Sequence, residues 1–353
     1  MRVCYFGTYD PAYSRNKILI RGLEENEVTV LECRTDKRGL SKYFDLFKKH
    51  WVIRKDYDVM VVGFPGFQAV ILARFLTSKP IIFDAFVSMY DSMVLDRGEA
   101  KPFSLRAKYY WWLDKISMTF PEVVLFDTQN HIDFVKNEFG IQDNKFVRIF
   151  VGADMEVFFP KKESKWQPKG EKFKVVSYGH YVPLQGMEYV VKSAYFLKDY
   201  DDIEFKIIGD GKGKDDLISF SEENNLRNIE FISNIPLEDL ALLMSEADVC
   251  LGIFGNSPKT KRVIPNKVYE AVALKKPVIT SDTPAVRELF SPEDLFLIEV
   301  SSAESIAKNI LFVKENKEEA ERRAENAYSK LLEFASTKEL GLQLKKIAEM
   351  YVK

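Results

Sequence analysis

Apolar and polar positions follow two alternating periods along most of the chain. Short runs rich in Val, Ile and Phe, typical of buried strands, are separated by longer segments with helical spacing, and this alternation predicts βα units on parallel sheets. In the first half we expect a helix over residues 14–24 and strands over 2–6, 27–33, 59–63, 80–83, 123–126 and 146–151. These elements suffice for one doubly wound sheet.

A second series of strands follows, predicted at 174–178, 204–208, 229–232, 249–253, 277–280 and 295–299. The polar stretch KKESKWQPKGEKFK between the two series contains Pro and Gly, as a domain linker does. We predict an N-terminal domain at 1–160, a C-terminal domain at 161–335, and a helix at 336–353 that packs back on the first domain. Ser301 and Ser336 are each followed three residues later by Glu, which predicts two capped helix starts.

Composition excludes several classes of protein. A chain of 353 residues, 46% hydrophobic and 29% charged, is expected to be an ordinary two-domain globular protein. With a net charge of -2 and interspersed signs, we expect no nucleic-acid partner, so any anion binding must be local. Cys4, Cys33 and Cys250 lack C-x-x-C spacing and predict neither a zinc site nor disulfides. No leader pattern follows Met1 and no apolar run is long enough to span a bilayer, so we expect a cytoplasmic protein.

Open α/β sheets bind ligands beyond the carboxyl ends of their strands, so the loops after strands are the candidate sites. The loop after the first strand combines a glycine with side chains whose hydrogen-bonding groups suit a sugar or a phosphate. Its candidate residues are Gly7, Tyr9, Asp10, Arg15 and Asn16.

Two loops of the second half are weaker candidates. Gly179 and Gly186 frame a loop that opens a helix, whose N-terminal amides favour a phosphate; His180 is either a phosphate donor or a structural hydrogen-bonding residue. The loop at 207–213, with Gly209, Asp210 and Gly211, matches neither G-x-G-x-x-G nor a P-loop. It is either a binding loop or a plain tight turn.

The segment 257–280 is the strongest candidate. A basic run of Lys259, Lys261 and Arg262 follows a predicted strand, where a pyrophosphate is expected. The helix after it holds Asn266, then Lys267 and Glu270, which are three residues apart and therefore share a face. The alternative is that these charges form a solvated surface.

Taken in order, the motifs GHYxPLQG, IIGDG, ADVCLGIF and IPNKVYEAVALKKPVITSD resemble the donor-binding half of family 4 glycosyltransferases. The first strand with its Gly loop, DAFVS and VGADxExFFP resemble the other half. The resemblance implies the α/β GT-B architecture, with two Rossmann-like domains facing each other across a cleft. It also implies a UDP-, GDP- or ADP-sugar donor on the C-terminal domain, an acceptor on the N-terminal one, and sugar transfer with retention of configuration and no obligatory metal or cofactor. Glu270 matches the family's second glutamate, whose carboxylate typically accepts two hydrogen bonds from the donor ribose.

The sequence departs from the family's pattern in three ways. Arg262 stands in place of the first glutamate, Phe86 in place of a frequent histidine, and His180 and Gln185 in place of an Arg and a Lys. Negative charge grows on the departing phosphate in the transition state, so cations must come from elsewhere. We infer a relocated phosphate clamp made of Lys259, Lys261, Arg262 and Lys267. The catalytic residue stays open, with Asp84 and Arg262 as candidates.

Two alternatives are a sugar-nucleotide epimerase and a nucleotide-sugar-binding protein without catalysis. Three histidines are few for the acid–base chemistry of an epimerase, whereas the missing glutamate suits the binding protein. The acceptor is a glycan, a lipid-linked molecule or a small molecule. Segments 42–55 and 101–115 interleave aromatic residues with Lys and Arg at helical spacing, which predicts peripheral contact with the inner face of a membrane. The alternative is that both segments are core helices with solvated flanks.

Overall fold

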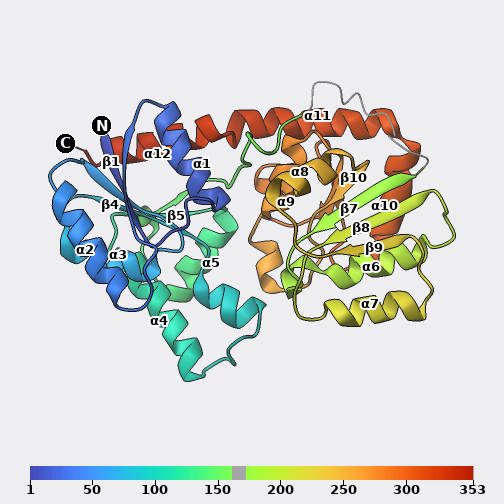
Figure 1. Ribbon diagram of the computed structural model, residues 1–353, viewed down its shortest axis with the longest axis horizontal. Coiled ribbons are helices and arrows are strands. Elements are labelled where there is room, and N and C mark those ends of the chain that lie inside the picture. The colour runs from blue at the N-terminus through green and yellow to red at the C-terminus, as the bar shows by residue number, and fades with distance from the viewer. Residues whose placement is uncertain (161–171, 353) are drawn as a thin grey trace. The chain divides into compact units, whose positions relative to one another are not determined.

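The computed structural model describes residues 1–160 and 172–352, and the chain forms two compact units (Figure 1). Unit 1 comprises Met1–Asp154 and Phe334–Lys353, and unit 2 comprises Met155–Glu333. The predicted linker lies largely outside the described residues. Which substrate each unit binds stays a prediction.

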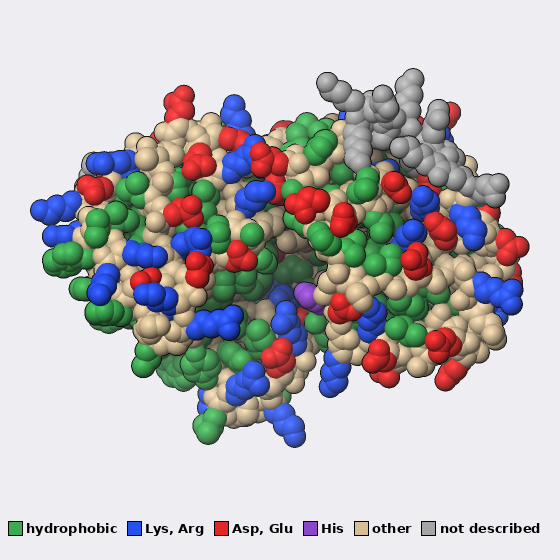
Figure 2. Space-filling view, in the orientation of Figure 1, with side chains coloured by type: hydrophobic (Ala, Val, Ile, Leu, Met, Phe, Trp, Pro, Cys, Tyr) green, Lys and Arg blue, Asp and Glu red, His purple; other side chains and the backbone are tan. Residues whose placement is uncertain are grey.

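Unit 1 is a six-stranded parallel sheet covered by helices. Its strands are β1 (Arg2–Gly7), β2 (Thr29–Arg34), β3 (Val59–Val62), β4 (Ile81–Phe86), β5 (Val123–Phe126) and β6 (Phe146–Arg148), in the order β2-β1-β3-β4-β5-β6. Its helices are α1 (Ser14–Glu25), α2 (Ser41–Ile53), α3 (Phe67–Leu76), the π-helix η1 (Asp91–Asp96), α4 (Leu105–Thr119), α5 (Gln129–Phe139), the 3-10 turn η2 (Asp143–Lys145) and α12 (Thr337–Glu349). Over α2, α3 and α4, hydrophobic and basic side chains are mixed on the outer surface (Figure 2).

Unit 2 repeats this architecture. Its strands are β7 (Phe173–Tyr178), β8 (Ile203–Ile208), β9 (Ile229–Ile232), β10 (Val249–Leu251), β11 (Val278–Ser281) and β12 (Phe296–Ile298), in the order β12-β11-β10-β7-β8-β9. Its helices are η3 (Pro183–Gln185), α6 (Met187–Phe196), α7 (Lys214–Glu223), α8 (Leu237–Ser245), η4 (Pro258–Lys261), α9 (Asn266–Ala273), η5 (Val286–Glu288), α10 (Ala303–Glu315) and α11 (Lys317–Phe334). The α/β prediction with two parallel sheets is therefore confirmed.

In both sheets, the order in which the chain adds strands reverses next to the first strand. In unit 1 the chain moves from β1 outward to β2 and then returns to the other side of β1 with β3; in unit 2 it moves from β7 to β9 and then places β10 on the other side of β7. At such a switch point the loops leave the sheet in opposite directions and open a crevice at the carboxyl edge. The loops after β1 and β3, and those after β7 and β10, are therefore where each unit can hold a ligand.

The last helix belongs to unit 1 because α12 packs on α1 at two glycines. A Cβ on Gly341 would lie 1.9 Å from the carbonyl carbon of Gly22, so the two backbones meet where neither residue has a side chain. Asn26 donates a side-chain hydrogen bond to the carbonyl of Lys338 (2.8 Å), and Lys345 donates to the carbonyl of Asn26 (2.9 Å). The two helices are thus joined by contact and by hydrogen bonds.

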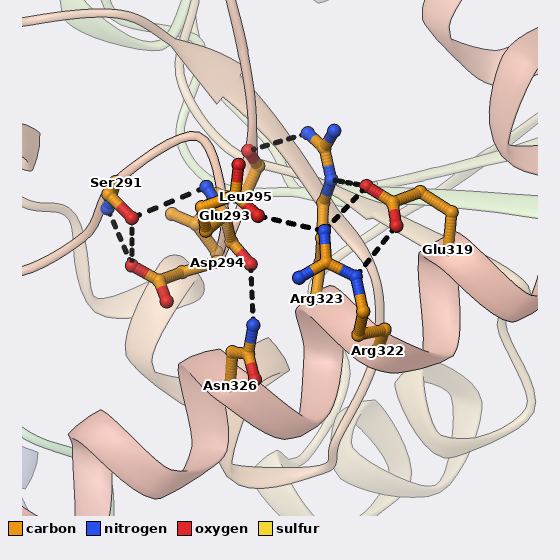
Figure 3. A network of polar contacts seen from close by, with 8 residues as sticks. All are labelled: Ser291, Glu293, Asp294, Leu295, Glu319, Arg322, Arg323 and Asn326. Carbon is orange, nitrogen blue, oxygen red and sulfur yellow. Dashed lines mark hydrogen bonds and ion pairs between the residues drawn. The ribbon is translucent and has the colours of Figure 1, made fainter.

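In unit 2, the loop before β12 is fastened to α11 by the polar network of Figure 3. Arg322 bridges Glu319 and Glu293, each at 2.9 Å from Nη2, and Asn326 donates to the Glu293 carbonyl (3.0 Å). Asp294 accepts hydrogen bonds from the backbone and the hydroxyl of Ser291, both at 2.7 Å. This network is structural, since it holds the end of the sheet to its covering helix.

Several predicted boundaries were wrong, among them the end of the strand predicted at 80–83, which extends to Phe86. Three others have local reasons. The strand predicted at 27–33 begins at Thr29 because Glu27, at φ +62°, still belongs to the turn after α1. The strand predicted to end at 151 stops at Arg148, and the next two carbonyls accept hydrogen bonds from Arg15. The first predicted cap is Ser302 instead of Ser301, whereas Ser336 caps α12 as predicted.

Candidate functional site

Gly179 lies directly after β7, at the switch point of unit 2, in a conformation that only glycine adopts easily. Its φ is +141°, and a Cβ there would lie 3.1 Å from Oε1 of Gln185 and 3.3 Å from Nζ of Lys267. The loop after β7 and the turn η3 that follows it therefore meet the first turn of α9, which is distant in sequence, at this glycine.

Lys267 is buried beside that loop and forms no ion pair with the residues that the structure describes. Its side chain is 4% exposed, and its Nζ makes no hydrogen bond to any residue that the structure describes. The Nζ lies 5.4 Å from the centre of the Tyr178 ring, and burial lowers the pKa of Lys267 to about 7. An unpaired buried ammonium is unfavourable by several kcal/mol, so its retention points to an anionic ligand.

Gln185 adds a second unsatisfied group at the same place. Its Oε1 is buried and has no hydrogen-bond partner among the described residues. Buried polar atoms in native proteins are nearly always paired, so a donor such as a sugar or ribose hydroxyl fits beside it. The loop thus offers one cationic donor and one neutral acceptor around the Gly179 backbone.

Glu270 lies on the same buried helix as Lys267 and reaches the same tyrosine. The side chain is 4% exposed, and the hydroxyl of Tyr178 donates a hydrogen bond to its Oε2. Tyr178 ends β7, so this contact ties α9 to the carboxyl edge of the sheet. The shared face predicted for Lys267 and Glu270 points toward the first loop of unit 2.

The remaining predicted residues of the β7 and β8 loops have supporting positions. Gly209 packs against the backbone of Gly179, and Gly211 against that of Tyr181. Asp210 accepts hydrogen bonds from Lys214 (2.7 Å) and from the backbone of Asn234 (2.8 Å), and these hydrogen bonds lower its pKa. Its carboxylate therefore stabilises the turn after β8, and this turn packs against the loop after β7.

Two other residues of the first loop differ in exposure. His180 is exposed, and Gly186 packs tightly against the backbone of Gly255, which follows β10. Gly186 therefore holds the two loops of the switch point together, while His180 is free to contact a ligand from the rim.

The basic run is more scattered than the sequence suggested. Lys259 is buried and interacts with another residue, Arg262 and Asn266 are half-buried, and Lys261 is exposed. The turn η4 that carries Lys259 and Lys261 packs against η3. Of the four predicted clamp residues, Lys267 lies nearest to Gly179.

In unit 1, Arg15 and Asp84 form a buried ion pair. Both side chains are fully buried, with 2.8 Å between Nη2 and Oδ1, and Arg15 also donates to the carbonyls of Ile149 (2.9 Å) and Phe150 (2.6 Å). Direct contact of Arg15 with an acceptor, and of Asp84 with reacting atoms, does not fit this burial. The pair instead fixes α1 and the ends of β4 and β6 relative to one another.

Tyr9 and Asn16 also bind within the protein. The Tyr9 hydroxyl donates to Glu32 (2.7 Å), and the Asn16 amide donates to the carbonyls of Phe64 (2.7 Å) and Asp10 (3.2 Å). Both are buried and shape the loop after β1 from inside. Gly7 ends β1 and is buried, whereas the Asp10 side chain is exposed.

A cavity of about 380 Å³ opens beside this loop, at the carboxyl ends of β1 and β2. It is lined by Thr8, Tyr9, Asp10, Thr35, Asp36, Lys37, Arg38, Gly39 and Lys42. Sequence reasoning missed the half that follows β2, although the run TDKRG after that strand was the available signal. Three cations against one carboxylate, that of Asp36, give this half a net positive lining, which suits an anionic ligand.

Phe86, at the position where the resemblance implied a frequent histidine, has φ +60° at the end of β4. Its ring packs against Phe64 at 5.1 Å and lies 6.4 Å from Tyr13. This strained, buried aromatic makes the carboxyl edge of β4 apolar, where the histidine would have made it polar.

Residues 158–330 match the family model described as Glycosyl transferases group 1. An uncharacterized glycosyltransferase of Methanocaldococcus jannaschii is 23% identical over 195 residues, which are 55% of this chain and 51% of that protein. This match spans about half the length of the relative.

Two solved structures are similar over nearly the whole chain. HepE of Anabaena, in complex with UDP, has a TM-score of 0.73 at 14% identity, with 99% of this chain and 100% of that chain covered. Sucrose-phosphate synthase of Thermosynechococcus elongatus has a TM-score of 0.74 at 14% identity, with 99% and 98% covered. At these identities the likeness establishes the fold. Residues 158–330 are thus similar in sequence to a group 1 glycosyltransferase domain, in a chain that has the fold of GT-B glycosyltransferases.

Proposed function

We propose that this protein transfers a sugar from a nucleotide-sugar donor to an acceptor with retention of configuration. The observation that carries the proposal is the buried Lys267 beside Gly179, which has no hydrogen-bond partner among the described residues and lies within the region that matches the group 1 model. The anomeric carbon loses its bond to the diphosphate, and the acceptor hydroxyl bonds to that carbon on the same face. The hydroxyl proton passes to a departing phosphate oxygen.

The donor diphosphate binds at the switch point of unit 2. Lys267 meets its growing negative charge, and this preorganised cation stabilises the transition state more than the ground state. Glu270 accepts hydrogen bonds from the ribose hydroxyls, while Gln185 accepts one from the donor. HepE is similar in fold and was solved with UDP and with UDP-glucose, so UDP-sugars are the first donors to test.

Supporting contacts to the diphosphate come from the loop ends. His180 donates from the rim, and Lys261, Arg262 and Asn266 contact the donor from the segment before and at the start of α9. Because Lys261 is exposed, its contribution is screened by water and salt and is smaller than that of Lys267.

The acceptor binds at unit 1, in the cavity beside the loop after β1. Asp10 contacts an acceptor hydroxyl from the exposed side of that loop, while Arg15 and Asp84 hold the loop in place. Lys37, Arg38 and Lys42 favour an acceptor that carries a phosphate or a carboxylate.

The test is incubation with UDP-, GDP- and ADP-sugars, with release of nucleoside diphosphate followed with and without candidate acceptors. We expect acceptor-dependent release that Glu270→Gln and Lys267→Met reduce, and a product whose anomeric configuration by NMR equals that of the donor. Inversion refutes retention.

The two alternatives give different results in this assay. An epimerase converts the nucleotide sugar into an isomer without any acceptor. A binding protein without catalysis, favoured by Arg262 in place of the first glutamate, retains nucleotide affinity but shows no turnover with any donor.

A further inference from the structure

Helix α2 carries two apolar stripes, of which one faces the core and one faces outward. Leu46 and His50 are buried, with Ile53 half-buried beside them. Leu40, Phe44, Phe47 and Trp51 recur at i, i+4, i+7 and i+11 on another face, where Phe44 is 61% and Trp51 56% exposed. Helical spacing aligns these four residues in one line. Packing in the core therefore does not account for the apolar residues of the outer stripe.

Helix α4 repeats the outer stripe with the same spacing. Leu105, Tyr109, Trp112 and Ile116 are all exposed, Trp112 by 54%. The opposite side of this helix, with Leu113 and Met118, is buried in unit 1. Both segments that the sequence marked as aromatic and basic thus expose an apolar line beyond their core face.

The two stripes belong to one surface because α3 packs against both helices. Gln68 on α3 donates to the Tyr109 hydroxyl (2.9 Å) and accepts from Lys42 (3.5 Å). Phe75, also on α3, is exposed and packs near Phe120. We call the outer side of α2, α3 and α4 the aromatic face; Figure 2 shows hydrophobic side chains among basic ones over these helices.

Basic residues are mixed into the aromatic face. Residues 40–55 contain five Lys and Arg against one Asp, whereas the whole chain has a net charge of -2. Lys48 lies over the Phe44 ring at 4.5 Å and Arg54 over the Trp51 ring at 3.9 Å. At a membrane interface, aromatic rings lie at the level of the lipid head groups, and neighbouring cations meet the lipid phosphates.

We propose that the aromatic face is a docking surface for an anionic phospholipid bilayer. The positive charge of this face favours an anionic bilayer over a second copy of the chain, because a two-fold dimer through this face would bring like charges together. None of the described helices is long and apolar enough to cross a membrane. The docking is peripheral, with the rings at the interface and the cations at the phosphates.

The experiment is co-sedimentation of the full chain with phosphatidylcholine vesicles and with vesicles one-third phosphatidylglycerol, at low and high salt. We expect binding to the anionic vesicles that weakens with salt. Lys48 on α2 and Lys108 on α4 are both exposed lysines. Lys48→Glu/Lys108→Glu should lower the partition coefficient by about 25-fold or more, since each cation contributes about fivefold. Trp51→Ser/Trp112→Ser should lower it by roughly tenfold or more.

The matched control is Phe196→Ser, which removes a comparably exposed ring from α6 in unit 2 and should bind vesicles as the wild type does. Circular dichroism establishes that each variant is folded. The proposal is overturned if the wild type stays in the supernatant at low salt, or if the tryptophan variant binds fully. A dimer that sedimentation velocity detects and the tryptophan variant abolishes, without vesicle binding, overturns it in favour of a second copy.

Discussion

Replacing Lys267 by Met should make the protein more stable and less able to bind nucleotide. Met keeps the length and apolar stem of the side chain and removes the ammonium. A pKa of about 7 in place of 10.5 means that burial disfavours the charged form by on the order of 5 kcal/mol. The unfolded chain does not carry this penalty, so its removal stabilises the folded state.

The sign and the pH window follow from the two pKa values. Between about pH 7 and 10.5 the unfolded chain binds more protons at this lysine than the folded one, so wild-type stability rises with pH across that window. Below pH 7 the full penalty applies. The Met variant should therefore gain about 4 kcal/mol at pH 7, and the gain should fade toward pH 10. Urea unfolding of both proteins at pH 7, 8.5 and 10 measures this difference.

The Met variant should be more stable than the wild type but should bind nucleotide more weakly. A diphosphate next to Lys267 raises the pKa of that lysine, so wild-type binding of UDP at pH 8 takes up close to one proton. Calorimetry in buffers of different ionisation enthalpy measures this uptake. The Met variant should take up none and bind roughly ten- to a hundredfold more weakly, as expected when a charged hydrogen bond is lost.

The control is Lys192→Met, the same substitution at an exposed lysine on α6. It should change neither the stability nor the affinity. If Lys267→Met leaves stability, UDP affinity and proton uptake as in the wild type, Lys267 is neither a penalised buried charge nor a ligand of the diphosphate, and the donor site must lie elsewhere.

Three further substitutions test other parts of the structure. Glu270→Gln should raise the donor KM at least tenfold with the melting temperature unchanged, and steady-state kinetics measure this; equal KM values would remove Glu270 from the site. Asp84→Ala leaves the Arg15 charge buried and unpaired and should lower the free energy of unfolding by about 3–5 kcal/mol in urea titrations, whereas a loss below 1 kcal/mol would contradict the buried pair. Gly341→Ala places a Cβ inside the Gly22 backbone and should lower stability by more than about 2 kcal/mol, or α12 does not pack as described.

The architecture was predictable because strands and loops leave local signals. Apolar runs at regular intervals located the strands, and the rule that ligands bind beyond the carboxyl ends directed attention to the loop at Gly179 and to the segment that holds Lys267. The GT-B fold followed from the order of several weak motifs. Boundaries failed where one side chain intervened, as Arg15 does at the end of β6.

Burial of individual charged residues was not predictable from the charge pattern. Lys267 and Lys261 look alike in the sequence, yet Lys267 is 4% exposed whereas Lys261 lies on the surface. The available signal was that α9 is apolar on all sides apart from its charges, which is typical of a helix surrounded by protein. Asp84 is 69 residues from Arg15, and no local pattern connects them.

The cavity of unit 1 and the aromatic face adjoin at Lys42, which lines the cavity and reaches Gln68 of the face. A lipid-linked acceptor with a phosphate fits both, because its head group would enter the basic cavity while its chains stay in the bilayer. A soluble glycan leaves the outer stripe of α2 without a role. If both proposals hold, turnover of a lipid-phosphate acceptor in anionic vesicles should fall in Lys48→Glu/Lys108→Glu, while turnover of a detergent-dispersed short-chain analogue should not. Equal loss with both acceptors would contradict this link, because a dispersed acceptor does not need the membrane to reach unit 1 and the substitutions would then act on turnover without involving membrane docking.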